Sequence, residues 1–203
     1  MAVATTTRLA AVNMILSAAG SAPVTGYSSS DGLDAVLANQ ILEETSNEVQ
    51  TLGWWFNTRQ GPIELTPDGS DNIVLTGPPP ALRVEAYTGN GAEAYTIRDG
   101  KLYDLLLGQN TFDAPVSLKE IVYLLEWTDL PEAARLYIAR KAARRFIDHH
   151  VSDPALARLA RQDEAEAMAL LGRDEILSSN SRAFGPENTR IIDRNKALDW
   201  VLW

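Results

Sequence analysis

The chain has 203 residues, of which 45% are hydrophobic and 22% are charged, and this composition excludes a protein that is disordered throughout. Its formal net charge of -9 disfavours long-range attraction to the nucleic-acid backbone, and the absence of cysteine excludes disulfides, thiolate metal sites and a cysteine nucleophile. The N-terminal residues lack the basic start and apolar core of a secretory signal, and no window has the roughly 18 to 20 apolar residues that span a bilayer. We therefore expect a soluble protein made in the cytoplasm that does not enter a membrane.

Two helices are predicted in the first 53 residues. Apolar residues recur at three- and four-residue spacing between Thr7, which can cap the first helix, and Gly20, which can end it. After a segment rich in Ser, Gly and Pro, Asp31 is placed to cap a second helix, which Gly53 closes. The buried stripe of the second helix is predicted to consist of Leu37, Ile41, Val49 and Leu52.

Residues 54–127 have a different character. Short runs rich in β-branched and aromatic residues alternate with Gly, Pro, Asn and Asp, which predicts a small antiparallel β region. Asp99 and Gly100 can supply the two positive φ angles of a type I′ turn and therefore predict a tight hairpin. The aromatic run Trp54-Trp55-Phe56 most simply predicts an anchor in the core. The runs that we interpret as strands are residues 54–65, 72–76, 82–87, 94–98, 101–107 and 117–127.

The helical spacing returns after Trp127. A third helix is predicted to follow Leu130-Pro131-Glu132 and to end near His150, and a fourth to follow the break at residues 152–154. Because a short loop joins them, they are expected to form an antiparallel hairpin of helices. The predicted buried residues are Leu136, Ala139, Ala143, Phe146 and Ile147 in the third helix and Leu156, Leu159, Ala160, Ala167, Leu170 and Leu171 in the fourth.

This order of elements predicts an α+β fold. We expect an antiparallel bundle of four main helices, an inserted small antiparallel β region and an extended C-terminal arm. The predicted division is residues 1–53 and 128–178 for the helical body, 54–127 for the β region and 179–203 for the arm. The fourth helix is expected to end soon after Glu175, because the sequence from Ser178 onward is not expected to continue a helix.

The last two helices carry opposite charge. Residues 131–161 contain seven Arg or Lys against three Asp or Glu, a balance of +4, whereas residues 162–178 contain one Arg against five Asp or Glu, a balance of -4. One interpretation is exposed helix faces stabilised by ion pairs within the chain. Another is a contact in which the basic side chains meet an acidic surface of an adjacent subunit. Phosphate binding is disfavoured because the rest of the chain is acidic. The candidate contact residues are Arg140, Lys141, Arg144, Arg145, Asp163, Glu164 and Glu166.

No pattern of side chains predicts catalysis, a metal or a cofactor. His149 and His150 are adjacent on a helix and point about 100° apart, so they are better placed to cap the helix end than to share a metal ion. Carboxylate pairs such as Glu43 with Glu44 are expected by chance in an acidic chain and are weak evidence for a glycosidase. The motifs of serine hydrolases, phosphate-binding loops, zinc peptidases and dinucleotide enzymes are missing from the sequence.

The last seven residues are unusually apolar for a terminus. They include Trp200 and Trp203, and leaving both indoles in water would forfeit a few kcal/mol of burial. This segment is therefore predicted to dock, either on its own domain or on a neighbouring subunit or partner. Trp200 and Trp203 are further candidate contact residues.

Four elements of the sequence, taken in order, resemble the tail tubular A proteins of short-tailed bacteriophages. They are residues 11–20 with Pro23 and Val24, the segment of residues 53–57, the hairpin at Asp99 and Gly100, and Leu130-Pro131-Glu132 with the Arg-rich helix and residues 163–167. Together they cover residues 8–178.

The resemblance implies a structural protein of the virion tail that has no cofactor. Such a protein is an adaptor in the neck, where it forms a twelve-subunit ring between the portal protein and a tail nozzle protein like tail tubular protein B. The genome DNA passes through the channel of the ring without sequence-specific binding. An acidic chain would line that channel without gripping DNA, and segments of +4 and -4 supply the two different patches that a head-to-tail ring needs. The alternatives are a virion polysaccharide hydrolase that uses a carboxylate pair and a DNA-contacting module that uses the arginines of the third helix.

Overall fold

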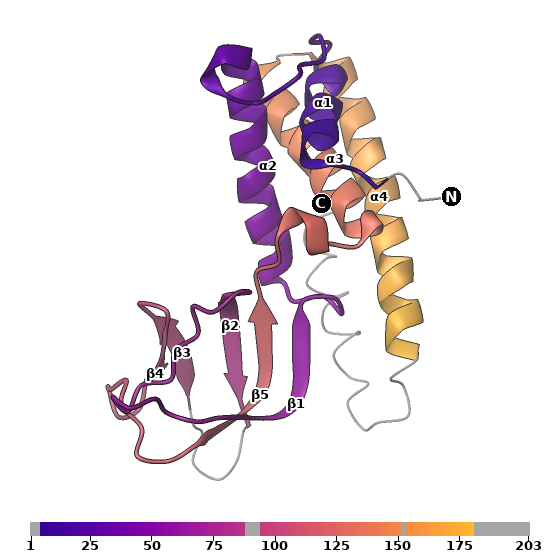
Figure 1. The fold of residues 1–203 in the computed structure, drawn as a ribbon. Coiled ribbons are helices and arrows are strands. Elements are labelled where there is room, and N and C mark those ends of the chain that lie inside the picture. Colours follow the sequence, from indigo (N-terminus) through magenta and orange to yellow (C-terminus); the bar gives the residue numbers. More distant parts are fainter. Residues whose placement is uncertain (1–4, 88–93, 152, 181–203) are drawn as a thin grey trace.

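The computed structural model describes residues 5–87, 94–151 and 153–180. Four α-helices stand side by side as a bundle, and the β strands lie at one end of it (Figure 1). The described part of the chain therefore confirms an α+β fold of four helices and small antiparallel sheets. Residues 181–203, with Trp200 and Trp203 and nearly all of the predicted arm, lie outside the described residues.

Helix α1, Arg8–Ala18, begins and ends where its sequence predicts. The Thr7 hydroxyl accepts a hydrogen bond from the Ala10 amide at 3.1 Å and so caps the first turn. At the other end Gly20 has a φ of +79°, and the amide of Ser21 donates to the Leu16 carbonyl at 2.9 Å. This is a Schellman end, which glycine favours because it has no Cβ.

Helix α2, Leu33–Thr51, differs from its prediction in two respects. Asp31 does not cap it, because Asp31 ends a short 3-10 turn, Ser29–Asp31, where its carboxylate accepts from the Ser28 amide at 2.9 Å. Gly32 occupies the N-cap position instead. The predicted stripe was wrong at Leu52, which follows the last helical residue and is exposed. The buried residues of α2 are Ala35, Ala38, Leu42, Thr45, Val49 and Gln50.

Two small sheets make up the β region. Strand β5, Val116–Tyr123, lies between β1, Thr58–Leu65, and β2, Ala81–Ala86, and pairs with both in the antiparallel sense. The predicted hairpin is confirmed as β3, Tyr95–Arg98, and β4, Lys101–Asp104, with φ of +49° at Asp99 and +70° at Gly100. Four predicted strand runs were too long or wrong. Residues 55–57 and 105–107 form turns, and β5 ends at Tyr123 instead of continuing to Trp127. Residues 72–76 make only isolated bridges, from Asn72 to Thr111 and from Val74 to Lys101.

Helix α3, Glu132–His150, is the central helix, and it packs against α1, α2 and α4. It therefore buries more than the single predicted stripe, including Ala134, Ile138 and Ala142. Helix α4, Pro154–Asn180, packs mainly against α3. Among the described residues this single neighbour leaves Leu159 and Leu170 exposed, although both were predicted to be buried. The helix also continues five residues past Glu175, so its predicted end was wrong.

Two buried amides connect the bundle to the sheet. Gln50, on the last turn of α2, donates to the Leu125 carbonyl at 3.1 Å and accepts from the Leu125 amide at 2.7 Å. The side-chain amide of Asn57 donates to the carbonyls of Gln50 and Tyr123, each at 2.8 Å, and its oxygen accepts from the Trp54 amide at 2.8 Å. We call Gln50 and Asn57 the amide junction. Trp54 beside it is buried, as predicted for an aromatic anchor.

Candidate functional site

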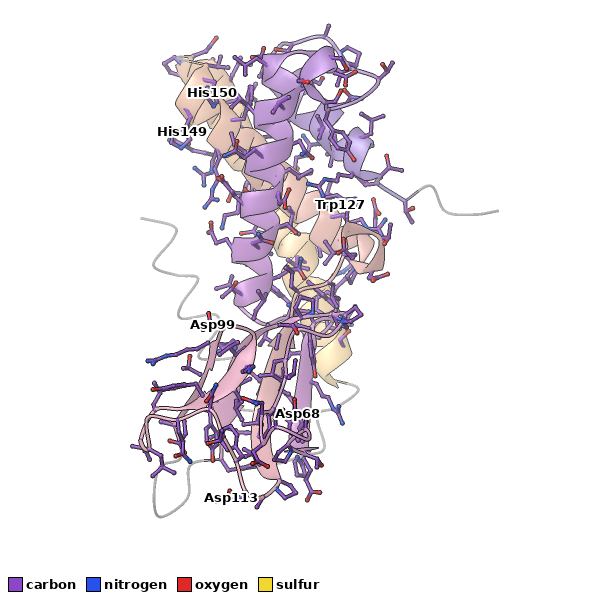
Figure 2. All side chains as sticks on the ribbon, turned by 60° about the vertical axis from the view of Figure 1, so that its left-hand side comes forward. Asp68, Asp99, Asp113, Trp127, His149 and His150 are labelled. Atoms are coloured by element: carbon purple, nitrogen blue, oxygen red, sulfur yellow. The ribbon has the colours of Figure 1, made fainter. Side chains whose placement is uncertain are left out.

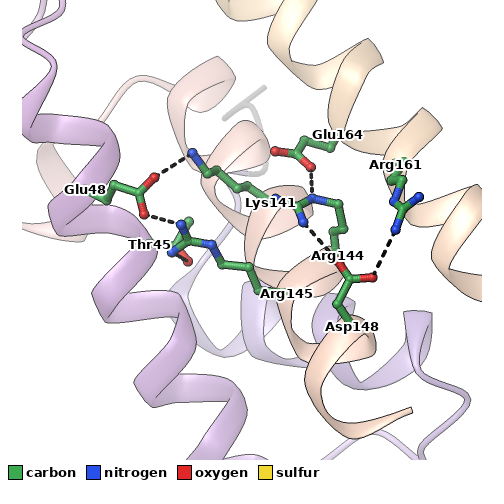
Figure 3. A network of polar contacts seen from close by, with 8 residues as sticks. All are labelled: Thr45, Glu48, Lys141, Arg144, Arg145, Asp148, Arg161 and Glu164. Atoms are coloured by element: carbon green, nitrogen blue, oxygen red, sulfur yellow. Dashed lines mark hydrogen bonds and ion pairs between the residues drawn. The ribbon is translucent and has the colours of Figure 1, made fainter. Parts of the chain in front are cut away.

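The four cations that the sequence singles out lie on α3, which runs between α2 and α4 (Figures 1 and 3). We call Arg140, Lys141, Arg144 and Arg145 the α3 basic cluster. Residues four apart on a helix lie on neighbouring turns of one side, so Lys141 with Arg145 and Arg140 with Arg144 form two pairs. The first pair faces α2 and the second faces α4.

Toward α2 the cluster meets one carboxylate. Lys141 Nζ lies 2.9 Å from Oε1 of Glu48, and Arg145 donates to Oε2 of the same residue (Figure 3). Arg145 also donates to the Thr45 hydroxyl at 3.4 Å. Burial raises the pKa of Glu48, but the hydrogen bonds from Lys141 and Arg145 outweigh burial, so the net pKa of this carboxyl is lowered. Glu48 is thus held ionised between two cations.

Toward α4 the cluster meets two predicted acidic residues. Arg140 donates to Asp163, and Arg144 donates to Glu164. Arg144 also lies 2.9 Å from Asp148, four residues along α3. Burial lowers the pKa of Arg144, but its hydrogen bonds to these carboxylates raise it by more. Glu166, the remaining acidic candidate, is exposed and accepts a hydrogen bond from the Gln162 side chain, one turn earlier on α4, at 3.0 Å.

These pairs bind three helices of one chain together. Partly exposed ion pairs contribute less than about 1 kcal/mol each, so their main effect is to fix which faces of α2, α3 and α4 meet. The phosphate-binding interpretation is disfavoured, because every cation of the cluster already has a carboxylate partner. A contact between the cluster and a neighbouring subunit stays a prediction.

The two histidines lie on the last turn of α3, at the end of the bundle away from the sheet (Figure 2). The ring of His150 packs on Phe146, with the ring centroids 4.9 Å apart. Throughout residues 5–87, 94–151 and 153–180, no group of three or more potential ligands could hold a metal ion.

A rigid loop at the end of β4 exposes three consecutive leucines. We call Leu105, Leu106 and Leu107 the leucine loop; they are 48%, 66% and 70% exposed. The buried carboxylate of Asp104 accepts from the amides of Leu106 at 2.8 Å and Leu107 at 2.9 Å, and the Asp104 amide donates to the Gln109 carbonyl at 2.8 Å. These hydrogen bonds fix the loop without burying its side chains. The hairpin turn at Asp99 lies on the bundle side of the β region and β4 runs away from it, so the loop faces away from the bundle (Figure 2).

Comparison with known proteins identifies the family. The profile of the tail tubular protein family matches residues 9–181. The chain is also 31% identical, over 187 residues, to tail tubular protein A of Klebsiella phage KP34, and the match covers 92% of this chain and 94% of that protein. The chain belongs to the tail tubular protein family.

A tail tubular protein is a structural component of the phage virion tail, which assembles with other tail components and is not an enzyme. Membership therefore argues against the polysaccharide hydrolase that the sequence left as an alternative. None of the described helices combines the length and the apolar character needed to cross a membrane.

Two polar residues that organise this tail tubular protein had no signal in the sequence. Glu48 lies 93 residues before Lys141, so no local spacing links them. Arg135 is buried and donates to the carbonyls of Thr128 at 2.6 Å and Thr6 at 3.4 Å, which attaches the segment before α1 to the start of α3. Arg135 is one of seven basic residues between positions 131 and 161, and nothing in the local sequence distinguishes it as buried.

Replacing Glu48 with glutamine is expected to lower stability most at neutral pH. Because the folded-state pKa of Glu48 is lowered, its contribution is complete above its unfolded pKa, about 4.3, and is lost as the pH falls through the folded pKa. After allowance for solvent screening we expect a loss of about 0.5 to 1 kcal/mol at pH 7. Thermal unfolding of both proteins between pH 7 and pH 3 checks this, since the difference in Tm should shrink toward low pH. The control is Glu44→Gln, at an exposed carboxylate that accepts from the side-chain amide of Gln40. If the Tm difference between Glu48→Gln and the native chain did not depend on pH, the pairing of ionised Glu48 with Lys141 and Arg145 would be contradicted.

Proposed function

We propose that this tail tubular protein is the adaptor of the virion neck. Twelve copies form a ring, one side of which docks on the portal protein and the other on the tail nozzle protein, and the genome DNA passes through the central channel. The membership in the family and the match over 94% of tail tubular protein A of Klebsiella phage KP34 support this role. An adaptor needs contacts with its own copies around the ring and with different proteins along the tail axis.

The leucine loop is the observation that supports a contact along the axis. Exposed apolar side chains are common singly, but three adjacent leucines on a loop held by its own hydrogen bonds are typical of an anchor for a partner. A rigid loop loses little conformational entropy on binding, so burial of its leucines contributes directly to affinity. We infer that the loop enters an apolar pocket of the portal or of the nozzle protein.

The charge of the chain supports passage of DNA without binding. The formal net charge is -9, and the four cations of the α3 basic cluster are paired with carboxylates of the same chain. A channel made from such subunits would repel phosphate weakly rather than retain it.

Mixing the purified chain with purified portal protein tests the proposal. Native mass spectrometry and electron microscopy should detect a ring of the chain on the portal, and the nozzle protein should then bind that complex. A chain that stays monomeric at every concentration and associates with neither protein would refute the adaptor role.

The variant Leu106→Asp is expected to weaken binding to one of these two partners at least tenfold. A charged side chain cannot enter an apolar pocket without a large desolvation cost, whereas the free chain tolerates it because Leu106 is mostly exposed. Affinity is measured by sedimentation with each partner, and thermal unfolding verifies the fold. Val74→Asp, at another exposed apolar side chain of the β region, is the matched control. Unchanged affinity for both partners would show that the loop is not the anchor.

A further inference from the structure

A groove lies between α1 and α4, above the surface of α3 on which both helices pack (Figure 1). Its volume is about 680 Å³, which lies in the range of sites that enclose small ligands. Eight of its twelve lining residues are apolar. Leu159, on the α4 side, is 55% exposed, so an occupant of the groove would bury it. We call this hollow the α1–α4 groove; its walls include Met14, Ser17 and Ala18 from α1 and Leu156, Leu159 and Ala160 from α4.

The lining of the groove favours an aromatic side chain that carries one hydrogen-bond donor. Ala18 and Ala160 leave room for a ring, and the thioether of Met14 can make favourable contacts with aromatic rings. Asp163 also lines the groove, and its carboxylate, which binds Arg140, has acceptor sites for a further donor. An indole has an apolar body and a single N–H group, which takes a partner when it is buried. The chemistry of the groove therefore fits tryptophan.

Two tryptophans of the chain are candidates for this place. The described fold already packs three of the five tryptophans against the core of the bundle. Trp200 and Trp203 are the other two, and they belong to residues 197–203, in which six of seven residues are apolar. This composition makes burial of the segment favourable, and the α1–α4 groove offers an apolar surface for it.

Residues 197–203 can reach the groove of their own chain. The groove borders the first turns of α4, and Leu159 lies 21 residues before the helix end at Asn180, about 32 Å along the helix axis. Residues 181–200 can span about 65 Å when extended, twice that distance. A connection that spans its site presents the attached group at about millimolar effective concentration, which exceeds the concentration of other copies in a dilute solution. Docking within one chain is therefore favoured over docking on a second copy.

We propose that residues 197–203 dock in the α1–α4 groove of the same chain and place an indole there. The indole packs on Met14 and Leu159 and donates its N–H to the carboxylate of Asp163. The segment thereby buries Leu159, which α3 leaves exposed. This docking goes beyond the adaptor role and does not depend on it, so it is measured on the purified chain without portal or nozzle protein.

Maleimide labelling of a thiol in the groove tests the docking, because the native chain has no cysteine. Ser17→Cys places the thiol on the α1 wall, at a position that is exposed in the described fold. Deleting residues 197–203 should raise its labelling rate at least tenfold, and the protection in the full chain should be the same at every protein concentration. Asn47→Cys, exposed on α2, should label equally fast with and without the segment. An unchanged rate at Ser17→Cys would overturn the proposal, and protection that grows with concentration would overturn it in favour of a second copy's segment.

Point variants show whether the segment uses this groove. Leu159→Asn removes the apolar side chain from the α4 wall without adding a charge that would alter the pKa of the nearby thiol. In the full chain with Ser17→Cys, it should raise the labelling rate to that of the deleted chain. Leu177→Asn is the matched control, because Leu177 is 59% exposed on α4 but does not line the groove, and it should keep the protection. Protection that survives Leu159→Asn, or that survives Trp200→Ala with Trp203→Ala, would overturn the proposal.

Thermal unfolding gives an independent answer through a double-mutant cycle. Leu159→Asn should lower Tm by about 2 to 4 °C more in the full chain than in the chain without residues 197–203, because only the full chain buries Leu159. Leu177→Asn should lower Tm by the same amount in both chains, which accounts for the lower helix propensity of asparagine. Equal shifts for Leu159→Asn in the two chains would show that the leucine and the segment are not in contact and would overturn the proposal.

Discussion

Replacing Asn57 with alanine is expected to lower the free energy of unfolding by about 2 to 4 kcal/mol. The side chain is nearly inaccessible to solvent, and it makes three hydrogen bonds of 2.8 Å, to the carbonyls of Gln50 and Tyr123 and from the amide of Trp54. Alanine leaves all three backbone groups buried without that partner. Urea unfolding of the full chain measures the loss as a shift of the transition midpoint at constant slope.

The matched control is Asn47→Ala, the same asparagine-to-alanine substitution at an exposed position of α2. It should change stability by less than about 0.5 kcal/mol, because no buried group loses a partner. A loss below about 1 kcal/mol for Asn57→Ala would mean that water replaces the amide and that the amide junction is not the main link between bundle and sheet. Because the Asn57 side chain donates to the backbone carbonyl of Gln50, the two residues are in contact, and the double variant Gln50→Ala with Asn57→Ala should lose less than the sum of the two single losses.

The elements that sequence predicted well are those whose signals are local. Thr7 and Gly20 define the two ends of α1 through hydrogen bonds between residues no more than five positions apart. The hairpin needs only the positive φ angles of Asp99 and Gly100. Asp31 has a side chain that can cap a helix, but its carboxylate accepts from the Ser28 amide in the 3-10 turn that precedes α2 and not from the first amides of α2. Local hydrogen-bond rules identify such residues but do not choose between two adjacent turns.

Burial was harder to predict, because the number of neighbours of a helix is a property of the whole fold. The leucines of α4 fit a buried stripe by spacing, yet Leu159 and Leu170 are exposed, since α3 alone covers most of the packed side of this helix. Conversely α3 has three helical neighbours and buries Lys141 and Arg135, which no hydrophobic pattern would place inside.

The candidate contact residues were half predictable for a similar reason. Ion pairs within the chain were one of the two interpretations that the charge pattern left open, and Arg140 with Asp163 and Arg144 with Glu164 form such pairs between α3 and α4. Glu48 could not be found, because it approaches Lys141 only after α2 packs on α3.

The variant Gly100→Ala is expected to lower the free energy of unfolding by about 2 to 4 kcal/mol, from two separable causes. Gly100 has a φ of +70°, where a Cβ costs about 1 to 2 kcal/mol. A Cβ at this position would also lie 1.9 Å from Cγ2 of Thr76, so one of the two segments must shift, at a cost of about 1 to 2 kcal/mol. The Gly100 carbonyl accepts from the Leu75 amide at 2.7 Å, so such a shift would loosen the packing of residues 73–75 on the hairpin.

A double-mutant cycle separates the two causes. Thr76 is exposed, so Thr76→Ala alone should change stability by less than about 0.5 kcal/mol, but it removes the methyl group that the new Cβ would meet. The double variant Thr76→Ala with Gly100→Ala should therefore recover about 1 to 2 kcal/mol and retain only the backbone cost. Additive losses would show that the backbone conformation alone demands glycine. Because β4 leads directly into the leucine loop, Gly100→Ala should also weaken binding to whichever partner Leu106→Asp weakens, and the double variant should restore most of that affinity.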